Sequence, residues 1–450
     1  MTVCGAGPGP ALVLVPGRDP LAAEIGWIGG HDVYARAHAR AARQAAFAPH
    51  LFCGAGQAGV QLTSLGCLHR VRRRPWPYKI WMAPVHVGAL ARAVEGFVAA
   101  GGHAPVVIHG FGVWGAVATH AARRLRTRGH PAVAVVSAYA THRFEARARV
   151  AALAPSHGLA ERLQYRALHQ VARHVVDRME RRACRAAEVV LVNYDAVARQ
   201  LVEAYGPGVR WRKIPYTSES AFRAGEPRAD LVRPGRLEAL QPAGAPLVLA
   251  VSRHDPRKGL EVLLRALARL RDRGVPFRGC LVGGGPLLER SRRQADRLGL
   301  RGQVTIEGLV PDPGPYLARA DVFVVPSIGE GSGSLALVEA LEAGLPVVAS
   351  ACDGIPEDVE GGRSALLVPP GDPEALASAL ACLLGAPGLR ATLGRGALAA
   401  HARRFSRPAF VAALAEVYAD LGLTRPANSG PAGDPANSLG DLVAPPPQVC

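Results

Sequence analysis

The stretch "PSIGEGSGSLALVEALEAGLPVVAS" at residues 326–350 decides the fold of this chain. An apolar run of strand length, "DVFVVPS" (321–327), leads into it, and a second run, "LPVVAS" (345–350), ends it. The residues between them have a helical pattern from Ser334 to Ala343, and Gly344 follows as a typical helix stop. A strand, a helix and a strand in succession predict two parallel strands joined by a crossover helix.

The same alternation continues through the second half of the chain. Three further apolar runs have the length of buried strands: "PLVLAVS" (246–252), "FRGCLVG" (277–283) and "QVTIEG" (303–308). Leucines recur at helical spacing from Leu260 to Leu270, and Gly274 ends that helix. We therefore predict a parallel, doubly wound sheet.

The first half repeats this pattern less clearly. Its strand-like runs, separated by helices rich in alanine and arginine, lie at residues 11–15, 49–53, 105–109, 132–136 and 188–193. We predict an α/β protein with two Rossmann-like, doubly wound domains that face a cleft. The expected divisions are an N-terminal domain at 1–224, a linker at 225–245, a second domain at 246–405, a C-terminal helix at 406–423 and a disordered tail at 424–450.

The net charge of +17 is placed in one half only. Residues 1–224 hold 29 lysines and arginines against 12 acidic residues, whereas residues 225–450 hold 24 of each. This asymmetry predicts different tasks for the two halves and an anionic partner for the first. A bias toward arginine in the coding sequence is the alternative, although such a bias should enrich both halves alike.

The cysteines and the apolar runs bear on location. Eight cysteines are scattered without a C-x-x-C pair, which favours reduced thiols and argues against a disulfide framework or a zinc site. No apolar run approaches about 18 residues, and the N-terminus does not resemble a secretory signal. We expect a cytoplasmic protein whose basic half can lie on the inner face of the cytoplasmic membrane.

The segment "SRHDPRKG" (252–259) contains one of only three lysines in the chain. It stands at the carboxyl end of the predicted strand 246–252, just before a helix, where ligands bind in such sheets. Arg253 and Lys258 could hold a phosphate there together with helix N-terminal amides. A solvated turn with two cations facing water is the alternative.

The opening stretch adds a second set of candidates at the same edge. Ser334 is placed to cap the predicted helix, so the amides of Ser334, Leu335 and Ala336 would present the positive end of the helix dipole. Glu330 precedes this helix and Glu339 lies inside it. Two carboxylates beside an anion site suggest hydroxyl groups on the ligand.

These motifs together resemble the donor domain of retaining glycosyltransferases of family 4, the glycosyl transferases group 1, which have the GT-B fold. The resemblance rests on an ordered series: "SRHDPRKG", "VGGGPLLE" (282–289), "VTIEGLV" (304–310), "YLARADVFVVPS" (316–327), the two glutamates, "GIPEDVEGG" (354–362) and "GDPEALASAL" (371–380). It covers residues 246–405 closely and the first half only loosely.

The resemblance implies a role for each matching position. Arg253 and Lys258 would neutralise the diphosphate of a UDP- or GDP-sugar, with Lys258 acting on the leaving group, Glu339 would bind the ribose and Glu330 the sugar hydroxyls. The other implied donor contacts are Gly29, Gly30, Gly308, Leu309, Ser334 and Leu335. No metal and no cofactor beyond the donor substrate is expected, because no D-x-D motif occurs.

Two features depart from the family pattern. Eight residues separate Glu330 from Glu339, where the family has seven. The family histidine after the fourth strand is replaced by Tyr139, and His109 and His142 are the nearby candidates for a sugar contact, with a structural role as the alternative for each.

The function predicted from the sequence is a retaining glycosyltransferase whose acceptor is a glycan or a lipid-linked or otherwise anionic molecule. A non-catalytic protein that binds nucleotide-sugars on the same fold is the alternative, and the glutamate pair disfavours an epimerase. "GAGQAG" (54–59) has the G-x-G-x-x-G spacing, but no acidic residue occurs between Val33 and Val94 to hold an NAD ribose. Nucleic acid is not expected as a partner.

Overall fold

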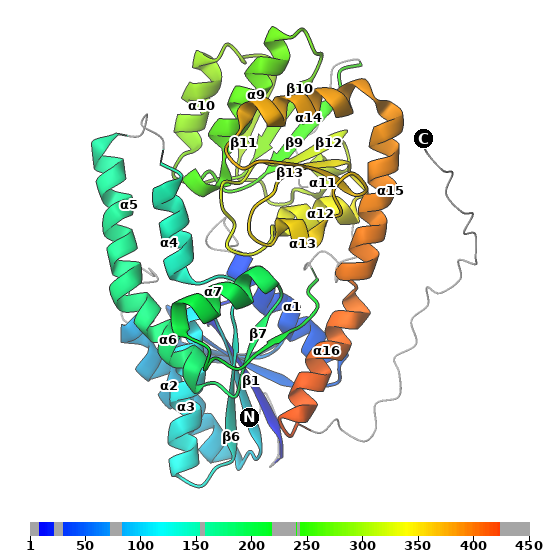
Figure 1. Ribbon diagram of the computed structural model, residues 1–450. Helices are drawn as coiled ribbons and strands as arrows, with labels where there is room; N and C mark the ends of the chain where they lie inside the picture. Colours follow the sequence, from blue (N-terminus) through cyan, green and yellow to red (C-terminus); the bar gives the residue numbers. More distant parts are fainter. Residues whose placement is uncertain are drawn as a thin grey trace, which may run out of the picture.

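The computed structural model describes residues 9–21, 30–72, 83–153, 158–217, 240 and 244–423. Two sheets organise the chain, one in each half (Figure 1). Gly29, most of the predicted linker and the whole predicted tail lie outside the described residues.

The first half forms an eight-stranded sheet with helices on both faces, in the strand order β3-β4-β2-β1-β5-β6-β7-β8. All described pairs in it are parallel except β3 with β4. Its elements are β1 Ala11–Arg18, α1 Gly30–Gln44, β2 Pro49–Ala55, β3 Gly59–Thr63, β4 Gly66–Arg72, α2 Ala83–Gly101, β5 Val106–Phe111, η2 Gly112–Trp114, α3 Gly115–Thr127, β6 Ala132–Ser137, α4 His142–Ala151, α5 Leu159–Val171, η3 Ala172–Val176, α6 Asp177–Ala186, β7 Val189–Val192, α7 Asp195–Tyr205 and β8 Trp211–Lys213.

The second half forms a six-stranded parallel sheet in the order β11-β10-β9-β12-β13-β14. Its elements are β9 Leu247–Val251, η6 Pro256–Lys258, α9 Leu260–Asp272, β10 Arg278–Val282, α10 Leu288–Arg297, β11 Val304–Gly308, α11 Gly314–Leu317, β12 Val322–Val325, α12 Leu335–Glu342, β13 Val347–Ser350, α13 Ile355–Asp358, β14 Ala365–Val368, α14 Pro373–Gly385, α15 Pro387–Arg404 and α16 Arg407–Asp420.

Alternation along each strand of the second sheet divides its core into two layers. In β9, Val248 and Ala250 pack on one face against α9 and α14, whereas Leu247 and Leu249 pack on the other face with α12. β9 is the first strand of this sheet, and it lies between β10 and β12. The strand order therefore reverses between β9 and β12, and the loops after these two strands start at the point where ligands bind in doubly wound sheets.

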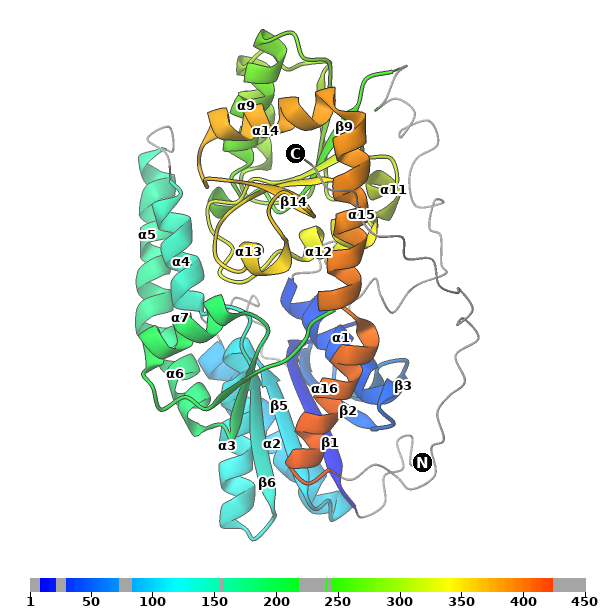
Figure 2. The same ribbon diagram turned by 45° about the vertical axis from the view of Figure 1, so that its right-hand side comes forward.

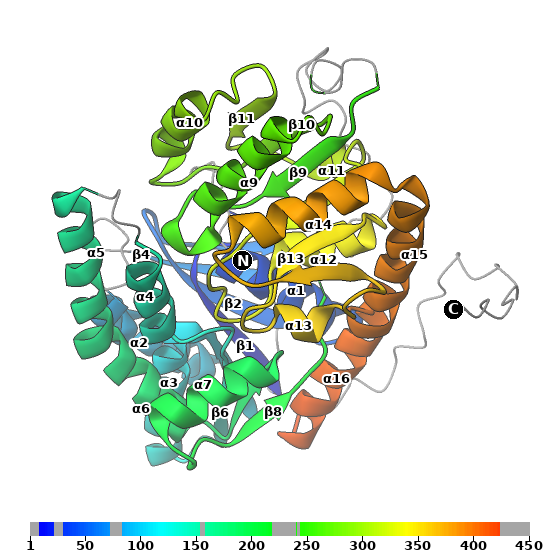
Figure 3. The same cartoon turned by 45° about the horizontal axis from the view of Figure 1, so that its top comes forward.

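Helices lie across the junction between the two halves on two opposite sides of the molecule. α15 runs down from the second domain, and α16 packs against α1 on the first domain, where Phe410, Leu414 and Tyr418 enter the core (Figure 2). The α4–α5 pair rises from the first domain on the opposite side, as both Figure 1 and Figure 3 show.

The predicted fold class is confirmed, but four strands were missed: β3, β4, β8 and β14. The first two correct the interpretation of "GAGQAG". Gly54 lies in β2 and Gly59 begins β3, so this segment opens a β-hairpin and not the helix that a dinucleotide fingerprint requires.

None of the described helices alone has the length and apolar character of a membrane span. The pair Pro373–Gly385 and Pro387–Asp420 meets those criteria only as a broken unit, bent by 104°.

Candidate donor site

Two loops meet at the carboxyl edge of the second sheet, one after β9 and one after β12. Asp255 caps the short helix η6, and Gly259 follows it with a φ of 65°. A Cβ on Gly259 would lie 1.9 Å from the carbonyl oxygen of Pro326, so the loop after β12 can approach only a glycine here. The Arg257 carbonyl accepts the Ile328 and Gly329 amides at 2.7 and 3.1 Å, which joins the two loops through their backbones.

Lys258 and Glu330 form an ion pair where these loops meet. The Lys258 Nζ contacts Glu330 Oε2, and the Ser327 hydroxyl donates to Glu330 Oε1 at 2.5 Å. Arg257 lies 3.7 Å from the same carboxylate and donates to the Glu330 carbonyl oxygen at 2.8 Å. The two residues that the sequence predicted for diphosphate and for sugar are thus brought together, but they bind each other.

Arg253 belongs to a wider group of cations. Burial lowers the pKa of Arg253, and the positive charges of Arg149 and Arg257 lower it further, against the opposite effect of Asp255. Concentrated positive charge of this kind is typical of an anion site. The structure therefore places Arg253 and Lys258 at the same sheet edge, as the sequence predicted.

The helix α12 begins beside this pair. Ser334 occupies its N-cap position with extended backbone angles, but its side chain makes no capping hydrogen bond, which corrects the predicted side-chain cap. Leu335 is the first helical residue, and its first-turn amides point out of the helix start. Glu339 lies one turn further on and is half-buried.

The charge of Glu339 acts on an aromatic group that the sequence did not reveal. Burial raises the pKa of Tyr216, and the neighbouring Tyr34 and Glu339 raise it further. The Tyr34 ring stacks on Tyr139 at a centroid distance of 3.7 Å and lies 4.7 Å from Tyr216. Tyr139 is the residue that replaces the family histidine, and the structure places it in this stack beside the edge of the first sheet.

The additional residue between the two glutamates lies in a loop that touches the first domain. A Cβ on Gly333 would lie 2.0 Å from the Tyr194 hydroxyl, so only glycine fits there. Gln200 donates to the Gly331 carbonyl at 2.6 Å, and Asp353 accepts the Glu330 and Gly331 amides at 2.6 and 2.8 Å. The loop is therefore fixed from both domains.

Residues of α4 also reach this edge from the first domain. Arg149 donates to Asp255 at 2.9 Å, and Arg257 donates to Glu145 at 3.3 Å. The neighbouring arginines, Arg257 first, outweigh burial and lower the pKa of Glu145. These pairs could not be predicted from the sequence, because ionic partners more than 100 residues apart leave no local sequence pattern.

The two histidine candidates have structural partners. His109 is fully buried, and its Nδ1 and Nε2 lie 2.9 Å from the Tyr418 hydroxyl and 2.7 Å from the Ser137 hydroxyl. His142 Nδ1 lies 2.5 Å from Glu180 Oε1. Burial favours the neutral imidazole of His142, but the Glu180 carboxylate outweighs burial and raises its pKa. Each candidate thus has a partner within the protein, and a sugar contact by either one stays a prediction.

The remaining predicted donor contacts are spread along the edge. Gly308 ends β11 with a φ of 80°, and Leu309 after it is 48% exposed, so its side chain is available to a ligand. Gly30 begins α1. Gly29 cannot be placed, because it lies outside the described residues.

Comparison with known proteins agrees with this geometry. Residues 245–386 match the family model for glycosyl transferases group 1. The chain is similar to D-inositol 3-phosphate glycosyltransferase 2 of Catenulispora acidiphila, 38% identical over 246 residues, which are 52% of this chain and 56% of the relative. It is also similar to the GDP-mannose-dependent alpha-(1-6)-phosphatidylinositol monomannoside mannosyltransferase of Mycolicibacterium smegmatis, 32% identical over 48% of this chain and 57% of the relative. The matched part spans just over half the length of these curated relatives.

Solved structures share the fold over nearly the whole chain. Sucrose-phosphate synthase from Thermosynechococcus elongatus superposes with a TM-score of 0.71 at 24% identity, covering 92% of this chain and 99% of the other. Anabaena HepE in complex with UDP-glucose superposes with a TM-score of 0.60 at 20% identity, covering 91% and 99%. The resemblance noted in the sequence is thereby supported: residues 245–386 match the glycosyl transferases group 1 model, and they are set in a two-domain fold of the GT-B type.

Proposed function

We propose that this protein is a retaining glycosyltransferase that moves a sugar from a UDP- or GDP-sugar to an acceptor hydroxyl. The observation that carries the proposal is the convergence of Arg253, Lys258 and the start of α12 where the strand order reverses. Two cations and a helix N-terminus suit a diphosphate. Similar proteins include a GDP-mannose-dependent enzyme and a protein solved in complex with UDP-glucose, which supports donors of both classes.

The ion pair between Lys258 and Glu330 suggests how a donor is received. A diphosphate carries more negative charge than one carboxylate, so it competes for the Lys258 ammonium. Glu330 keeps Arg257 and the Ser327 hydroxyl as partners when Lys258 turns away. Its Oε2 is then available to accept a hydrogen bond from a sugar hydroxyl.

The transfer step needs no nucleophile from the protein. The bond from the anomeric carbon to the diphosphate oxygen breaks, and the bond to the acceptor oxygen forms on the same face. The acceptor proton passes to the departing diphosphate, whose growing negative charge Arg253 and Lys258 stabilise. Preorganised charge of this kind contributes on the order of 10²–10³-fold per donor to enzymatic rates.

For the acceptor we propose a lipid-linked or otherwise anionic molecule, glycosylated at the cytoplasmic face of a membrane. The first domain has the entire excess of positive charge, with 29 basic against 12 acidic residues in 1–224. Two similar proteins are named for inositol 3-phosphate and for a phosphatidylinositol mannoside. Both are consistent with an acceptor that carries phosphate.

A protein that binds nucleotide-sugars without transferring them is the second candidate, because Lys258 and Glu330 already satisfy each other. Thermal denaturation with UDP, GDP, UDP-glucose and GDP-mannose identifies the nucleotide, since a ligand at 100 times its Kd adds about 2.7 kcal/mol to stability. Release of free nucleotide from the stabilising sugar nucleotide then separates the two candidates. Binding without release, in the presence of a panel of phosphoinositol and sugar acceptors, would exclude the transferase.

A further inference from the structure

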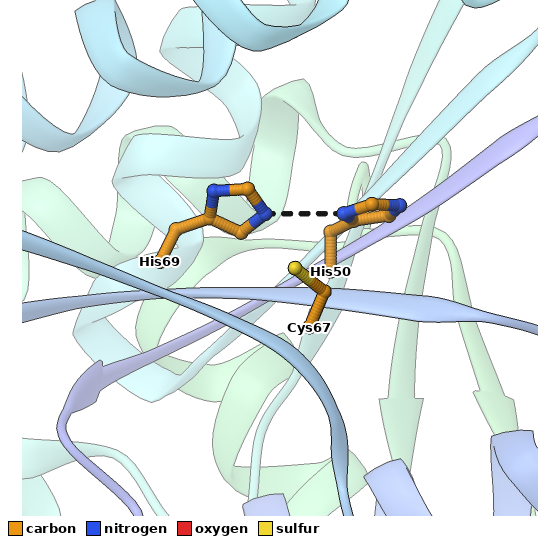
Figure 4. A group of neighbouring side chains, drawn as sticks. All are labelled: His50, Cys67 and His69. Atoms are coloured by element: carbon orange, nitrogen blue, oxygen red, sulfur yellow. Dashed lines mark hydrogen bonds between the residues drawn. The ribbon is translucent and has the colours of Figure 1, made fainter. Parts of the chain in front are cut away.

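Two imidazoles and a sulfur atom meet inside the first domain, away from the donor site. His50 lies on β2, and Cys67 and His69 lie on the neighbouring strand β4. His50 and Cys67 are partners in the parallel register, and His69 is two residues further along β4, so all three side chains point to one face of the sheet. Figure 4 shows the Cys67 sulfur directed toward the gap between the two rings.

The distances suit a single metal ion. The Nδ1 of His50 lies 3.1 Å from Nε2 of His69, and the ligand atoms of all three residues lie within 4.8 Å of one another. A tetrahedral zinc ion has Zn–N distances of about 2.0–2.1 Å and Zn–S of about 2.3 Å, so its ligand atoms lie roughly 3.3–3.6 Å apart. Small side-chain rotations bring the three atoms to that spacing.

The surroundings hold the rings in place. Phe52 stacks on His69 at 4.3 Å with an interplanar angle of 3°, and Phe97 of α2 lies 4.4 Å from His50. His50 and Cys67 are buried, whereas His69 is half-buried and leaves a path to solvent. A neutral imidazole is the form of histidine that ligates a metal.

Cys67 is not available as a thiolate in this structure, because it is held in a disulfide, in contrast to the reduced thiols expected from the sequence. Reduction by a thiol or a phosphine adds two electrons and two protons and yields two thiols. On meeting a metal ion, the Cys67 thiol gives up its proton and becomes a ligand. The redox state of Cys67 thus decides whether the set has two ligands or three.

We propose that His50, Cys67 and His69 form a zinc site that is filled when Cys67 is reduced and lost when it is oxidised. Two imidazoles and one thiolate are a ligand set that zinc prefers, and water can complete the tetrahedron at the half-buried side of His69. The site goes beyond the sugar-transfer function. The sequence argued against a zinc site because it has no C-x-x-C pair, whereas the proposed set combines Cys67-x-His69 with a histidine on an adjacent strand.

The first test uses the full-length wild-type protein. It is reduced with tris(2-carboxyethyl)phosphine. The phosphine is oxidised to its phosphine oxide, and water supplies the oxygen of the oxide and the two protons of the new thiols. The reagent is then removed in the absence of air. Titration with Co²⁺ should then give a thiolate-to-cobalt charge-transfer absorption that is complete at one equivalent. Zn²⁺ should displace the Co²⁺ and abolish this absorption. The oxidised protein should not give the band. If the reduced wild type binds neither ion, or binds Co²⁺ without the charge-transfer band, the site does not exist as proposed.

Variants identify the ligands. Cys67→Ser and His69→Gln should each weaken Zn²⁺ binding by more than about 100-fold, since even the loss of a partner behind a ligand costs 10–100-fold. Cys382→Ser, at an exposed cysteine of α14, and His130→Gln, after α3, are matched controls and should bind like wild type. Unchanged thermal denaturation of the metal-free variants shows that folding is intact. Wild-type affinity in Cys67→Ser would overturn the proposal, whatever the protein's activity.

Discussion

Two buried polar clusters, one in each half of the molecule, bring together different kinds of groups. At the carboxyl edge of the second sheet, Lys258 and Glu330 form an ion pair. Between β2 and β4 of the first sheet, His50 and His69 stay neutral because burial lowers the pKa of each to about 4. A paired charge can exchange its partner for an anionic ligand, whereas a neutral imidazole offers a lone pair to a cation.

This difference suggests different kinds of ligand at the two places. Arg149 and Asp255 extend the paired charges across the junction between the domains, with Asp255 almost fully buried. The aromatic rings of Phe52 and Phe97 enclose the imidazoles.

Removing one member of a buried pair should have the largest effect, and it should be on stability. Arg149→Leu leaves the Asp255 carboxylate buried with weaker partners, so the free energy of unfolding should fall by about 3 kcal/mol. Arg301→Leu is the matched control, because its pair with Asp296 is exposed and should contribute less than about 1 kcal/mol. Urea denaturation followed by circular dichroism measures both. Equal midpoints for the two variants would mean that the junction does not depend on this pair.

The second prediction concerns Lys258 as a charge on the leaving group. Lys258→Ala should slow the release of nucleotide from the sugar nucleotide by on the order of 10²-fold, comparable to the loss of one preorganised donor. Lys213→Ala is the control, since Lys213 pairs with Asp195 and Glu357 and not with Glu330. Steady-state turnover of the two purified variants provides the comparison. Wild-type turnover in a folded Lys258→Ala protein would end the assignment and leave the ion pair with a structural role.

The third prediction concerns the ribose. Glu339→Gln keeps the shape of the side chain but removes its charge, and one charged hydrogen bond contributes about 1.5 kcal/mol or more, so UDP or GDP affinity should fall by about tenfold. Glu342→Gln, three residues further along α12, should leave it unchanged. Isothermal titration with the free nucleotide measures both affinities. If the two variants bind alike, Glu339 does not contact the nucleotide.

The fold was predictable from the sequence to a greater extent than the site. Runs such as 246–252 and 345–350 are buried on both faces of a parallel sheet, so their uniform apolar character was a direct signal for β9 and β13. The hairpin strand β3 is exposed along most of its length, and β8 has only three residues, so neither gives such a signal. Local pattern identifies buried strands and overlooks those at the edges.

Within the site, sequence reasoning found the residues but not their partners. Lys258 was recognised by its rarity and Glu330 by its place before a helix, yet nothing in the sequence showed that they pair across 72 residues. The same holds for Arg149 with Asp255 and for His50 with His69. Such contacts arise when loops from different strands converge, and only the three-dimensional arrangement determines them.

The smallest effect is expected from single arginines at the surface of the basic first domain. Arg72 is exposed at the end of β4 and begins the run Arg72–Arg74, whose other two members lie outside the described residues. A basic residue near an anionic bilayer contributes about 1 kcal/mol, so Arg72→Ser should weaken binding to vesicles that contain phosphatidylglycerol by roughly fivefold at low salt.

Arg301→Ser is the control. The Arg301 side chain is 85% exposed, but it lies in the half of the chain where the charges balance. Co-sedimentation with vesicles at increasing salt tests both variants, and electrostatic binding should weaken as screening increases. If coding bias alone placed the arginines, the two variants should bind equally, and wild type should not distinguish anionic from neutral vesicles. A specific loss in Arg72→Ser would instead show that the charge asymmetry between the halves has a physical use, with one half directed toward an anionic surface and the other toward an anionic donor.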